Sequence, residues 1–256
     1  MANRVFGLQT FGEIPEEWAE TIAAKGWGRV RVEGAAYDAV MAQCQRYSLW
    51  PVWIVKSEAE AATVPSGIDV ELLNEPDLAG WTPQRYNAFV RSVYDTLAAK
   101  GNTVYAGCVS NQSKANHAWL KSALAGLPPD VRASGHRYPD ADQDPNTPKK
   151  GYRNRSDELR GWMDAIGGRK FAITETGFHT APYSTGWWLW KKRGQRTDAD
   201  VARFLLREYG IWKAAGADYV VTYQINDGPG SGWLDRYGIR TVDGRWKTAA
   251  NLPLVG

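Results

Sequence analysis

The chain has 256 residues, of which 43% are hydrophobic and 23% are charged, and its formal net charge at pH 7 is +3. This hydrophobic fraction supports a packed core and excludes an intrinsically disordered chain. Lysine and arginine are spread along the sequence, so we expect no nucleic-acid partner. The densest basic stretch, KKRGQR at 191–196, is short, and we expect a solvated loop there rather than a phosphate-binding patch.

Strand-like runs alternate with helical patterns along the whole chain. The expected strands are 4–10, 28–33, 50–56, 67–75, 103–110, 132–138, 170–176 and 217–226. The expected helices, in which apolar residues recur at spacings of three and four, are 15–25, 36–47, 83–100, 114–126, 155–167 and 197–216. The segment after the third strand, residues 57–66, is too short for a full helix. Repeats of this kind without a linker predict one domain, residues 1–256, folded as an α/β protein of the (β/α)₈ TIM-barrel type.

The N-terminal stretch, residues 1–18, has no long apolar segment, so we expect neither a signal peptide nor a membrane span in this chain. A soluble protein of this kind would be secreted if a leader had been removed, and cytoplasmic otherwise. Cys44 and Cys108 have no neighbouring cysteine, which excludes a CxxC metal site, and we expect two free thiols. We also expect a monomer with no cofactor, no metal and no membrane partner.

Two acidic residues lie where expected strands end. Glu75 ends the fourth strand in ELLNEPDL, and Glu175 ends the seventh in ITETGF. The carboxyl ends of barrel strands meet at one mouth, so both side chains are expected to project into it. Two carboxyl groups at such a mouth suit glycoside cleavage, although either one alone could cap a helix or pair with a lysine. Glu71, inside the fourth strand, is expected to be an interior ion-pair partner.

These motifs resemble those of glycoside hydrolase clan A, the retaining (β/α)₈ glycosidases. ELLNEPDL at 71–78 and ITETG at 173–177 look like the signatures of its fourth and seventh strands. SGHRYP at 134–139 is similar to the sixth-strand motif of the β-xylosidase-like members, and YGIRTVDGRWK at 237–247 resembles their closing stretch. The likeness therefore runs from the fourth strand to the C-terminus.

The resemblance implies a retaining β-glycoside hydrolase that cleaves a polysaccharide or oligosaccharide by double displacement. Glu75 would be the general acid/base and Glu175 the nucleophile. Asn74 would hydrogen-bond the sugar 2-hydroxyl, Tyr138 would steady Glu175, and His136 would line the site beside it. A chain of this length has little room for an accessory domain or an enclosed pocket, which favours an open cleft and endo action.

Arg31 occupies the place where many clan members carry an arginine in the second strand. A direct role at the site and a salt bridge inside the barrel are both open, and Glu33, on the same face of the strand, is the expected partner for the salt bridge.

Aromatic residues near the mouth are further candidates for contact with a sugar. Clan members commonly carry a tryptophan at the end of the eighth strand, whereas this chain has Tyr223 and Gln224 there. We expect Gln224 to contact the substrate and Trp233 to supply the missing ring from the following loop. Trp187, in the loop after the seventh strand, could form a sugar subsite or could pin that loop to the barrel.

Two other classes of protein are compatible with this pattern. One is a carbohydrate-binding barrel that has lost activity, although the presence of both carboxylates argues against loss. The other is a metal-dependent barrel hydrolase that uses His117, His136 and His179, the only three histidines in the chain. Since only the last two lie near strand ends, a three-histidine zinc site is not expected.

Overall fold

Eight parallel strands close into a barrel within the part of the chain that the structure describes. This structure is a computed structural model, and it describes residues 3–11, 14–33, 37–139, 145–185, 192–230 and 232–252. The barrel strands are β1 (Asn3–Phe11), β2 (Trp27–Glu33), β3 (Trp50–Val55), β4 (Asp69–Leu72), β5 (Thr103–Val109), β6 (Arg132–Arg137), β7 (Phe171–Thr176) and β10 (Val220–Thr222). Their order around the barrel is β1-β10-β7-β6-β5-β4-β3-β2, so each strand neighbours those before and after it in the repeat.

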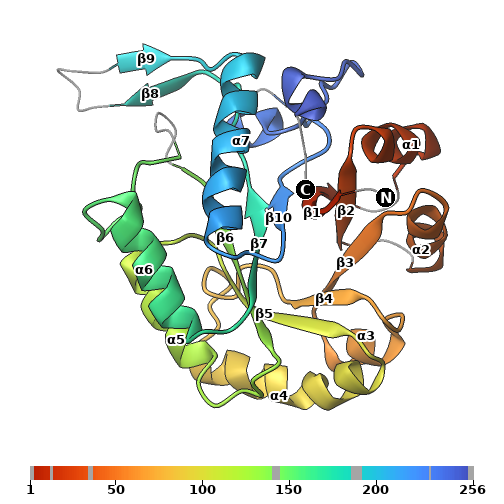
Figure 1. Cartoon of the computed structure of the whole chain (residues 1–256), viewed down its shortest axis with the longest axis vertical. Helices are drawn as coiled ribbons and strands as arrows, with labels where there is room; N and C mark the ends of the chain where they lie inside the picture. The colour runs from red at the N-terminus through yellow and green to blue at the C-terminus, as the bar shows by residue number, and fades with distance from the viewer. Residues whose placement is uncertain are drawn as a thin grey trace.

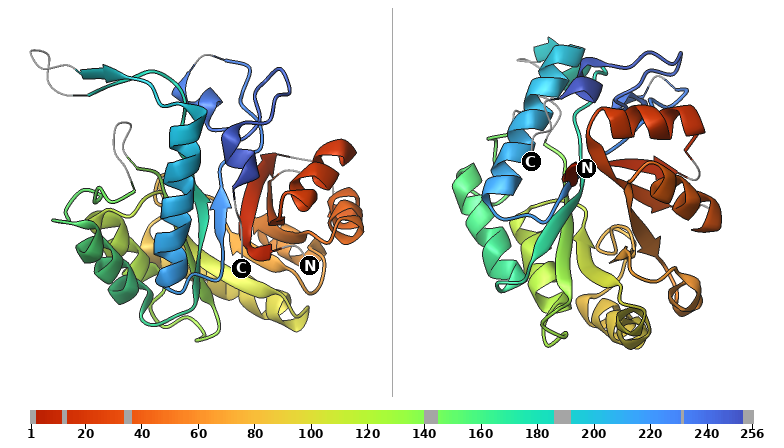
Figure 2. Two further views of the ribbon diagram at one scale, coloured as in Figure 1. Left: turned by 45° about the horizontal axis from the view of Figure 1, so that its top comes forward. Right: turned by 45° about the vertical axis from the view of Figure 1, so that its right-hand side comes forward.

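Helices surround the barrel, one after each of the first six strands and one after β7 (Figures 1 and 2). They are α1 (Glu16–Ala24), α2 (Tyr37–Arg46), α3 (Glu58–Thr63), α4 (Pro83–Ala99), α5 (Lys114–Ala123), α6 (Arg155–Ile166) and α7 (Asp198–Ala214). Two short 3₁₀ helices, η2 (Trp233–Arg236) and η3 (Thr248–Asn251), follow β10. The predicted (β/α)₈ barrel is confirmed, and only six residues of helix form after β3, as the sequence predicts. Within the described ranges, no helix has the length and apolarity needed to cross a membrane.

Side-chain hydrogen bonds begin several of these helices at the predicted positions. Thr82, Ser113, Asn154 and Thr197 each accept a bond from a backbone N–H in the first turn. Such caps satisfy donors that the first turn of a helix otherwise leaves unpaired, and each contributes about 1 kcal/mol. The helix starts could therefore be read from the local sequence.

The structure differs from the predicted elements at the mouth of the barrel. The strands predicted at 67–75 and 217–226 are shorter, because β4 ends at Leu72 and β10 ends at Thr222. After β4 the chain turns away from the sheet through two left-handed residues, Leu73 with φ 62° and Glu75 with φ 45°. Apolar composition could not show this, since a strand ends where its neighbour no longer offers hydrogen-bond partners.

A hairpin forms in the region that the sequence predicts as a long loop after β7. It consists of β8 (Tyr183–Thr185) and β9 (Lys192–Gly194), which pair antiparallel and extend away from the barrel (Figures 1 and 2). The prediction of a solvated loop at 191–196 is wrong in part. Part of the stretch lies in β9, and Arg196 is buried with its guanidinium over the ring of Tyr183.

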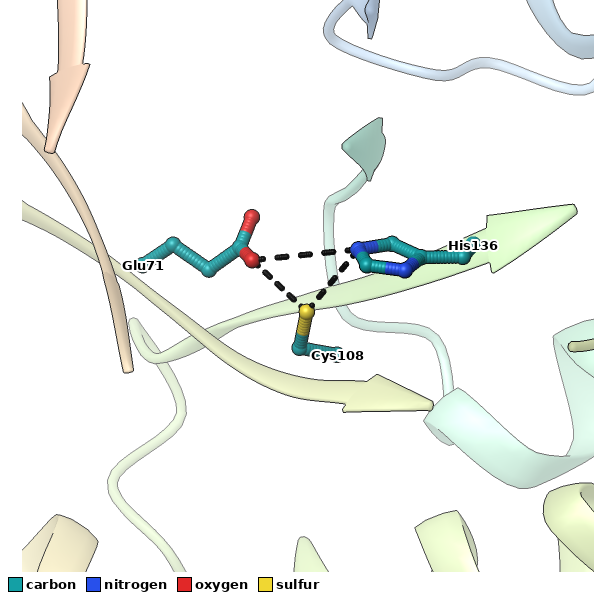
Figure 3. A group of neighbouring side chains, drawn as sticks. All are labelled: Glu71, Cys108 and His136. Atoms are coloured by element: carbon teal, nitrogen blue, oxygen red, sulfur yellow. Dashed lines mark hydrogen bonds and ion pairs between the residues drawn. The ribbon is translucent and has the colours of Figure 1, made fainter. Parts of the chain in front are cut away.

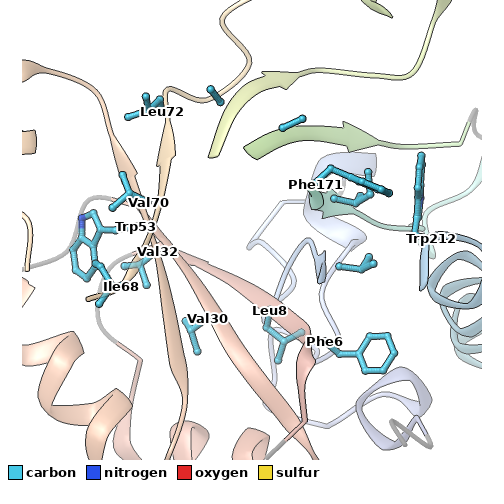
Figure 4. Close-up of a cluster of buried hydrophobic side chains, with 14 of the residues drawn as sticks. Phe6, Leu8, Val30, Val32, Trp53, Ile68, Val70, Leu72, Phe171 and Trp212 are labelled. Atoms are coloured by element: carbon cyan, nitrogen blue, oxygen red, sulfur yellow. The ribbon is translucent and has the colours of Figure 1, made fainter. Parts of the chain in front are cut away.

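Strand residues that face the helices form the main hydrophobic core. Figure 4 shows several of them, including Val30 and Val32 of β2 and Val70 and Leu72 of β4, all fully buried. Alternate residues on these two strands face the barrel interior, as the two-residue period of a strand requires. On β2 and β4 these inward residues are charged, and they form the ion pairs Arg29–Asp69 and Arg31–Glu71. The second pair lies directly beneath the predicted catalytic residues.

Candidate active site

The two predicted carboxylates meet at the mouth of the barrel. Glu175 lies near the end of β7, and Glu75 lies three residues beyond β4. A single imidazole nitrogen lies between them: Nδ1 of His136 is 2.8 Å from Glu75 Oε1 and 3.4 Å from Glu175 Oε2. One carboxylate oxygen from each residue and this nitrogen all lie within 4.8 Å of one another. The barrel therefore brings together two carboxyl groups that are 100 positions apart in the sequence.

Glu175 is almost fully buried and is held by donors on both of its oxygens. Nη1 of Arg31 donates to Oε1 at 2.5 Å, and the hydroxyl of Tyr138 donates to Oε2 at 2.6 Å. A shift in register between β6 and β7 after Gly135 sets His136 directly opposite Glu175. The carboxylate is thereby fixed in one orientation, with its negative charge compensated by a guanidinium.

Arg31 is the centre of a buried polar network. Its guanidinium donates to Glu71 Oε1 at 2.5 Å, to Gln9 Oε1 at 2.6 Å and to Asn74 Oδ1 at 2.9 Å. Burial alone would lower the pKa of Arg31, but the charges of Glu71 and Glu175 outweigh it and raise the pKa well above its ordinary value. Being fully buried, this cation can act on a ligand only through the groups that it holds.

The prediction that Glu33 pairs with Arg31 is wrong, whereas the prediction that Glu71 is an interior ion-pair partner is confirmed. Glu33 pairs with Lys56 instead. The reason is geometric, since side chains two residues apart on one strand point in parallel rather than toward each other. The carboxylate of Glu71 comes from another strand and meets the guanidinium in the barrel interior.

A cavity of about 390 Å³ lies above the carboxylates. Asn74, Glu75 and Glu175 form part of its wall, together with three tyrosines from the chain after β6 and after β10. The rings of Tyr138, Tyr223 and Tyr237 meet edge to face, with centroids 5.5 to 6.1 Å apart. This cluster places aromatic surface beside Glu175.

The rim of this cavity carries apolar side chains that are exposed to solvent. Phe11, Leu78 and Leu234, from three different segments, are 57%, 71% and 56% exposed. Large apolar side chains grouped at an open cavity are typical of ligand-binding surfaces.

The structure brings some of the predicted site residues together. Six of them, namely Arg31, Asn74, Glu75, His136, Tyr138 and Glu175, form one connected cluster. Gln224 is half-buried and is not on the cavity wall, where its neighbour Tyr223 lies instead. Trp187 lies outside the described residues, as does the side chain of Trp233.

Three residues of this network were not predicted as site residues: Gln9, Glu71 and Cys108. Cys108 is the penultimate residue of β5, the position that His136 has in β6 and Glu175 has in β7. The sequence feature that could have identified Cys108 as a site residue is its place in GCVS, residues 107–110, at the end of a predicted strand. Gln9, inside β1, carries no such signal.

Two groups of side chains in the described ranges have donor atoms close enough to surround a metal ion: Glu71–Cys108–His136 and Glu75–His136–Glu175. Neither brings two histidines together, and His117 is held elsewhere by Tyr152 and Gln112. Burial, together with the negative charge of Glu71, raises the pKa of Cys108 well above its ordinary value. The thiol therefore keeps its proton in the hydrogen-bonded cluster that the structure shows, where it contacts Glu71 and His136.

Fold and site together define a (β/α)₈ barrel with paired carboxyl groups at the carboxyl ends of its strands. No protein-family model matches the chain, and no curated protein matches it. Solved structures that share its fold include glycoside hydrolases and a glucanosyltransferase, in line with the resemblance to clan A.

A family 39 glycoside hydrolase from Bacteroides cellulosilyticus aligns with 96% of this chain and 61% of its own, at 14% identity and a TM-score of 0.71. A β-1,3-glucanosyltransferase from Rhizomucor miehei aligns with 96% of this chain and 97% of its own, at 13% identity and a TM-score of 0.64. A GH5-4 broad-specificity endoglucanase from Clostridium acetobutylicum aligns with 94% of this chain and 88% of its own, at 15% identity and a TM-score of 0.61. At these identities the likeness establishes the fold.

Proposed function

We propose that the protein is a retaining β-glycoside hydrolase that acts by double displacement. The observation that carries the proposal is the separation of Glu75 and Glu175, whose facing oxygens lie within 4.8 Å. Retaining enzymes hold their two carboxyl groups about 5 to 5.5 Å apart, whereas inverting enzymes need about 6.5 to 9.5 Å to admit a water. The gap is therefore suited to direct attack on the sugar by one carboxylate.

The surroundings of the two carboxyl groups support different roles. Glu175 is the nucleophile, since Arg31 and Tyr138 hold it rigidly and only 9% of its side chain is exposed. Glu75 is the acid/base, since 25% of its side chain is exposed toward the cavity, where a leaving group and then a water must reach it. Asn74 turns its amide oxygen toward Arg31, so its amide nitrogen is the donor for the sugar 2-hydroxyl.

The substrate is a β-linked oligosaccharide or polysaccharide. The structural neighbours include enzymes named as β-1,3-glucanosyltransferase, endo-β-1,4-glucanase and exo-β-1,3-glucanase, which makes β-glucans the first substrates to test. The tyrosines around the cavity offer aromatic faces of the kind on which sugar rings stack.

The test is a screen of aryl β-glycosides and β-glucans in which the anomeric configuration of the first product is followed by ¹H NMR. Retention supports the proposal, and an inverted first product would contradict it. Binding of glucans without turnover would favour an inactive carbohydrate-binding barrel.

Azide separates the two proposed roles. Glu175→Ala with azide should release the α-glycosyl azide, because azide attacks from the side of the missing nucleophile. Glu75→Ala with azide should release the β-glycosyl azide, because azide attacks the glycosyl-enzyme. Glu33→Ala is the matched control, a carboxylate on the same cavity wall that should give no azide adduct. Equal behaviour of the three variants would refute the assignment.

A further inference from the structure

A buried chain of hydrogen bonds runs beneath the two carboxylates. Figure 3 shows its members, Glu71, Cys108 and His136, with the thiol between the carboxylate and the imidazole. Sγ of Cys108 is 2.6 Å from Glu71 Oε1 and 3.1 Å from His136 Nε2. All three side chains are fully buried, so their protons can be exchanged only among these groups and their neighbours.

The local backbone turns Cys108 toward this cluster. The pairing of β5 with β6 shifts register between Ala106 and Val109, an irregularity of the kind that re-aims side chains at barrel rims. Gly107, with φ 111°, and Cys108, with φ 33°, both lie on the positive side of φ. A Cβ at Gly107 would lie 2.3 Å from a methyl of Leu120, so glycine is required there. The orientation of the thiol is thus built into the strand.

Counting protons defines the direction of each bond. Burial alone would raise the pKa of Glu71, but the charge and hydrogen bonds of Arg31 outweigh it and lower the pKa, so this carboxylate can only accept. The thiol has a single proton and donates it to Glu71. Its sulfur therefore faces His136 with a lone pair, and Nε2 of the imidazole must carry a hydrogen. Nδ1 is left as the nitrogen that gains and loses a proton.

We propose that Cys108 is a positioning residue that fixes a hydrogen on Nε2 of His136, so that Nδ1 shares one proton with Glu75. The inference rests on the proposed function, in which Glu75 is the acid/base. Either protonated Glu75 donates to Nδ1, or the imidazolium donates from Nδ1 to the Glu75 carboxylate, across the same 2.8 Å. When the leaving oxygen takes the proton from Glu75, a carboxylate and a neutral imidazole remain.

The charges around His136 keep this shared proton in place. Burial would lower the pKa of His136, yet the charge of Glu175 and the hydrogen bond to Glu75 outweigh it and raise the pKa. The ionisable groups that face the ring are Arg31, Glu71, Glu75, Cys108, Tyr138 and Glu175. A neutral imidazole with its hydrogen on Nδ1 would instead require Glu75 to be deprotonated, which is the wrong state for an acid.

Proton placement can be measured directly, because the chain has only three histidines. In protein labelled with ¹⁵N-histidine, two-bond ¹H–¹⁵N spectra distinguish the tautomers, and His117→Gln and His179→Gln assign the remaining signals. We expect Nε2 of His136 to stay protonated at every pH while Nδ1 titrates. Cys108→Ser should preserve this pattern and Cys108→Ala should lose it. A hydrogen on Nδ1 in the neutral wild-type ring, or an unchanged pattern in Cys108→Ala, would overturn the inference.

Kinetics provide a second measurement that a purely structural role would not affect. A 2,4-dinitrophenyl glycoside has a good leaving group that departs without general acid catalysis, whereas the leaving group of a phenyl glycoside must be protonated. General acid catalysis contributes about 10²- to 10⁴-fold to the rate. We therefore expect Cys108→Ala to lower kcat/KM for the phenyl glycoside at least about tenfold and to change kcat/KM for the dinitrophenyl glycoside little. Cys108→Ser should recover most of the loss.

The two kinetic outcomes are distinct from failure of the proposed function. Equal losses with both substrates in Cys108→Ala would overturn the positioning role. If the wild type cleaves no glycoside, the proposed function fails, and the tautomer spectra still decide whether Cys108 places the proton of His136.

Discussion

Replacement of Arg31 by methionine would remove a buried guanidinium that forms ion pairs with both Glu71 and Glu175. Nitrogens of Arg31 lie 2.5 Å from Glu71 and from Glu175, whose side chains are 0% and 9% exposed. Methionine keeps most of the apolar stem, so the change tests the charge more than the packing. Removing one partner of a buried ion pair costs about 3 to 5 kcal/mol. We expect Arg31→Met to lower the free energy of unfolding by about 4 kcal/mol near neutral pH, a large part of the stability of an ordinary domain.

The loss should depend on pH in a defined direction. In the wild type the pKa of Glu71 is lowered from 4.5, since Arg31 outweighs the effect of burial. A carboxyl group of this kind contributes stability above its unfolded pKa and loses that contribution as the pH falls through its folded pKa. Without Arg31, the largest influence opposing burial is lost, and the folded carboxyl group binds a proton more readily than it does in the wild type. The difference between wild type and variant should therefore be largest at high pH and should shrink toward pH 4.

Urea denaturation followed by tryptophan fluorescence at several pH values measures this difference. Arg46→Met is the matched control, because it removes an arginine whose ion pair with Glu16 is exposed to solvent, and its stability should equal that of the wild type. Glu71→Gln added to Arg31→Met should recover part of the loss. A loss below about 1 kcal/mol, or one that does not change with pH, would refute the reasoning.

Three further outcomes follow from the structure. Gly107→Ala should lower the free energy of unfolding by about 3 kcal/mol, because the φ of 111° disfavours alanine and the new Cβ would overpack. Gly210→Ala, in α7 and with nothing within 4 Å of the new Cβ, should raise it by about 0.5 to 1 kcal/mol. Thermal unfolding would show whether the two melting temperatures shift in opposite directions. Burial lowers the pKa of His117 from 6.5 to about 4, so the unfolded chain takes up a proton that the folded protein refuses, and stability falls as the pH drops below 6.5. Between pH 7 and pH 4.5 the wild type should lose about 2.5 kcal/mol more than His117→Gln, and parallel curves would exclude this cause. Tyr138→Phe removes the hydroxyl bond to Glu175 and should lower kcat/KM about tenfold or more, whereas a change under about twofold would show that the bond is not needed.

The fold could be predicted because its signals are local. Several barrel strands, such as β3 (WPVWIV), are short runs rich in β-branched and aromatic residues, and Thr82, Ser113, Asn154 and Thr197 mark helix starts through bonds made within three residues. The ends of the strands were less predictable. Glu75 and Leu73 continue the composition of β4, yet they have positive φ values where the chain leaves the sheet at the barrel mouth.

The candidate site was predicted as residue types but not as contacts. The motifs around Glu75, His136 and Glu175 could be recognised because they follow strands that end at one face of the barrel. The partner of Arg31 was predicted wrongly as Glu33, since spacing along one strand says nothing about which side chain lies across the barrel.

The sequence by itself determined the eightfold alternation of strands and helices, the helix starts, and which end of the barrel would carry the carboxyl groups. Only the tertiary structure decided that Glu75 and Glu175 lie within 4.8 Å, that Arg31 joins residues as far as 144 positions away, and that Cys108 faces His136. The physical reason is that these contacts depend on strand register and on the shift within β5, which leave no periodic trace in the sequence. Local patterns define the elements, whereas closure of the barrel brings their ends together.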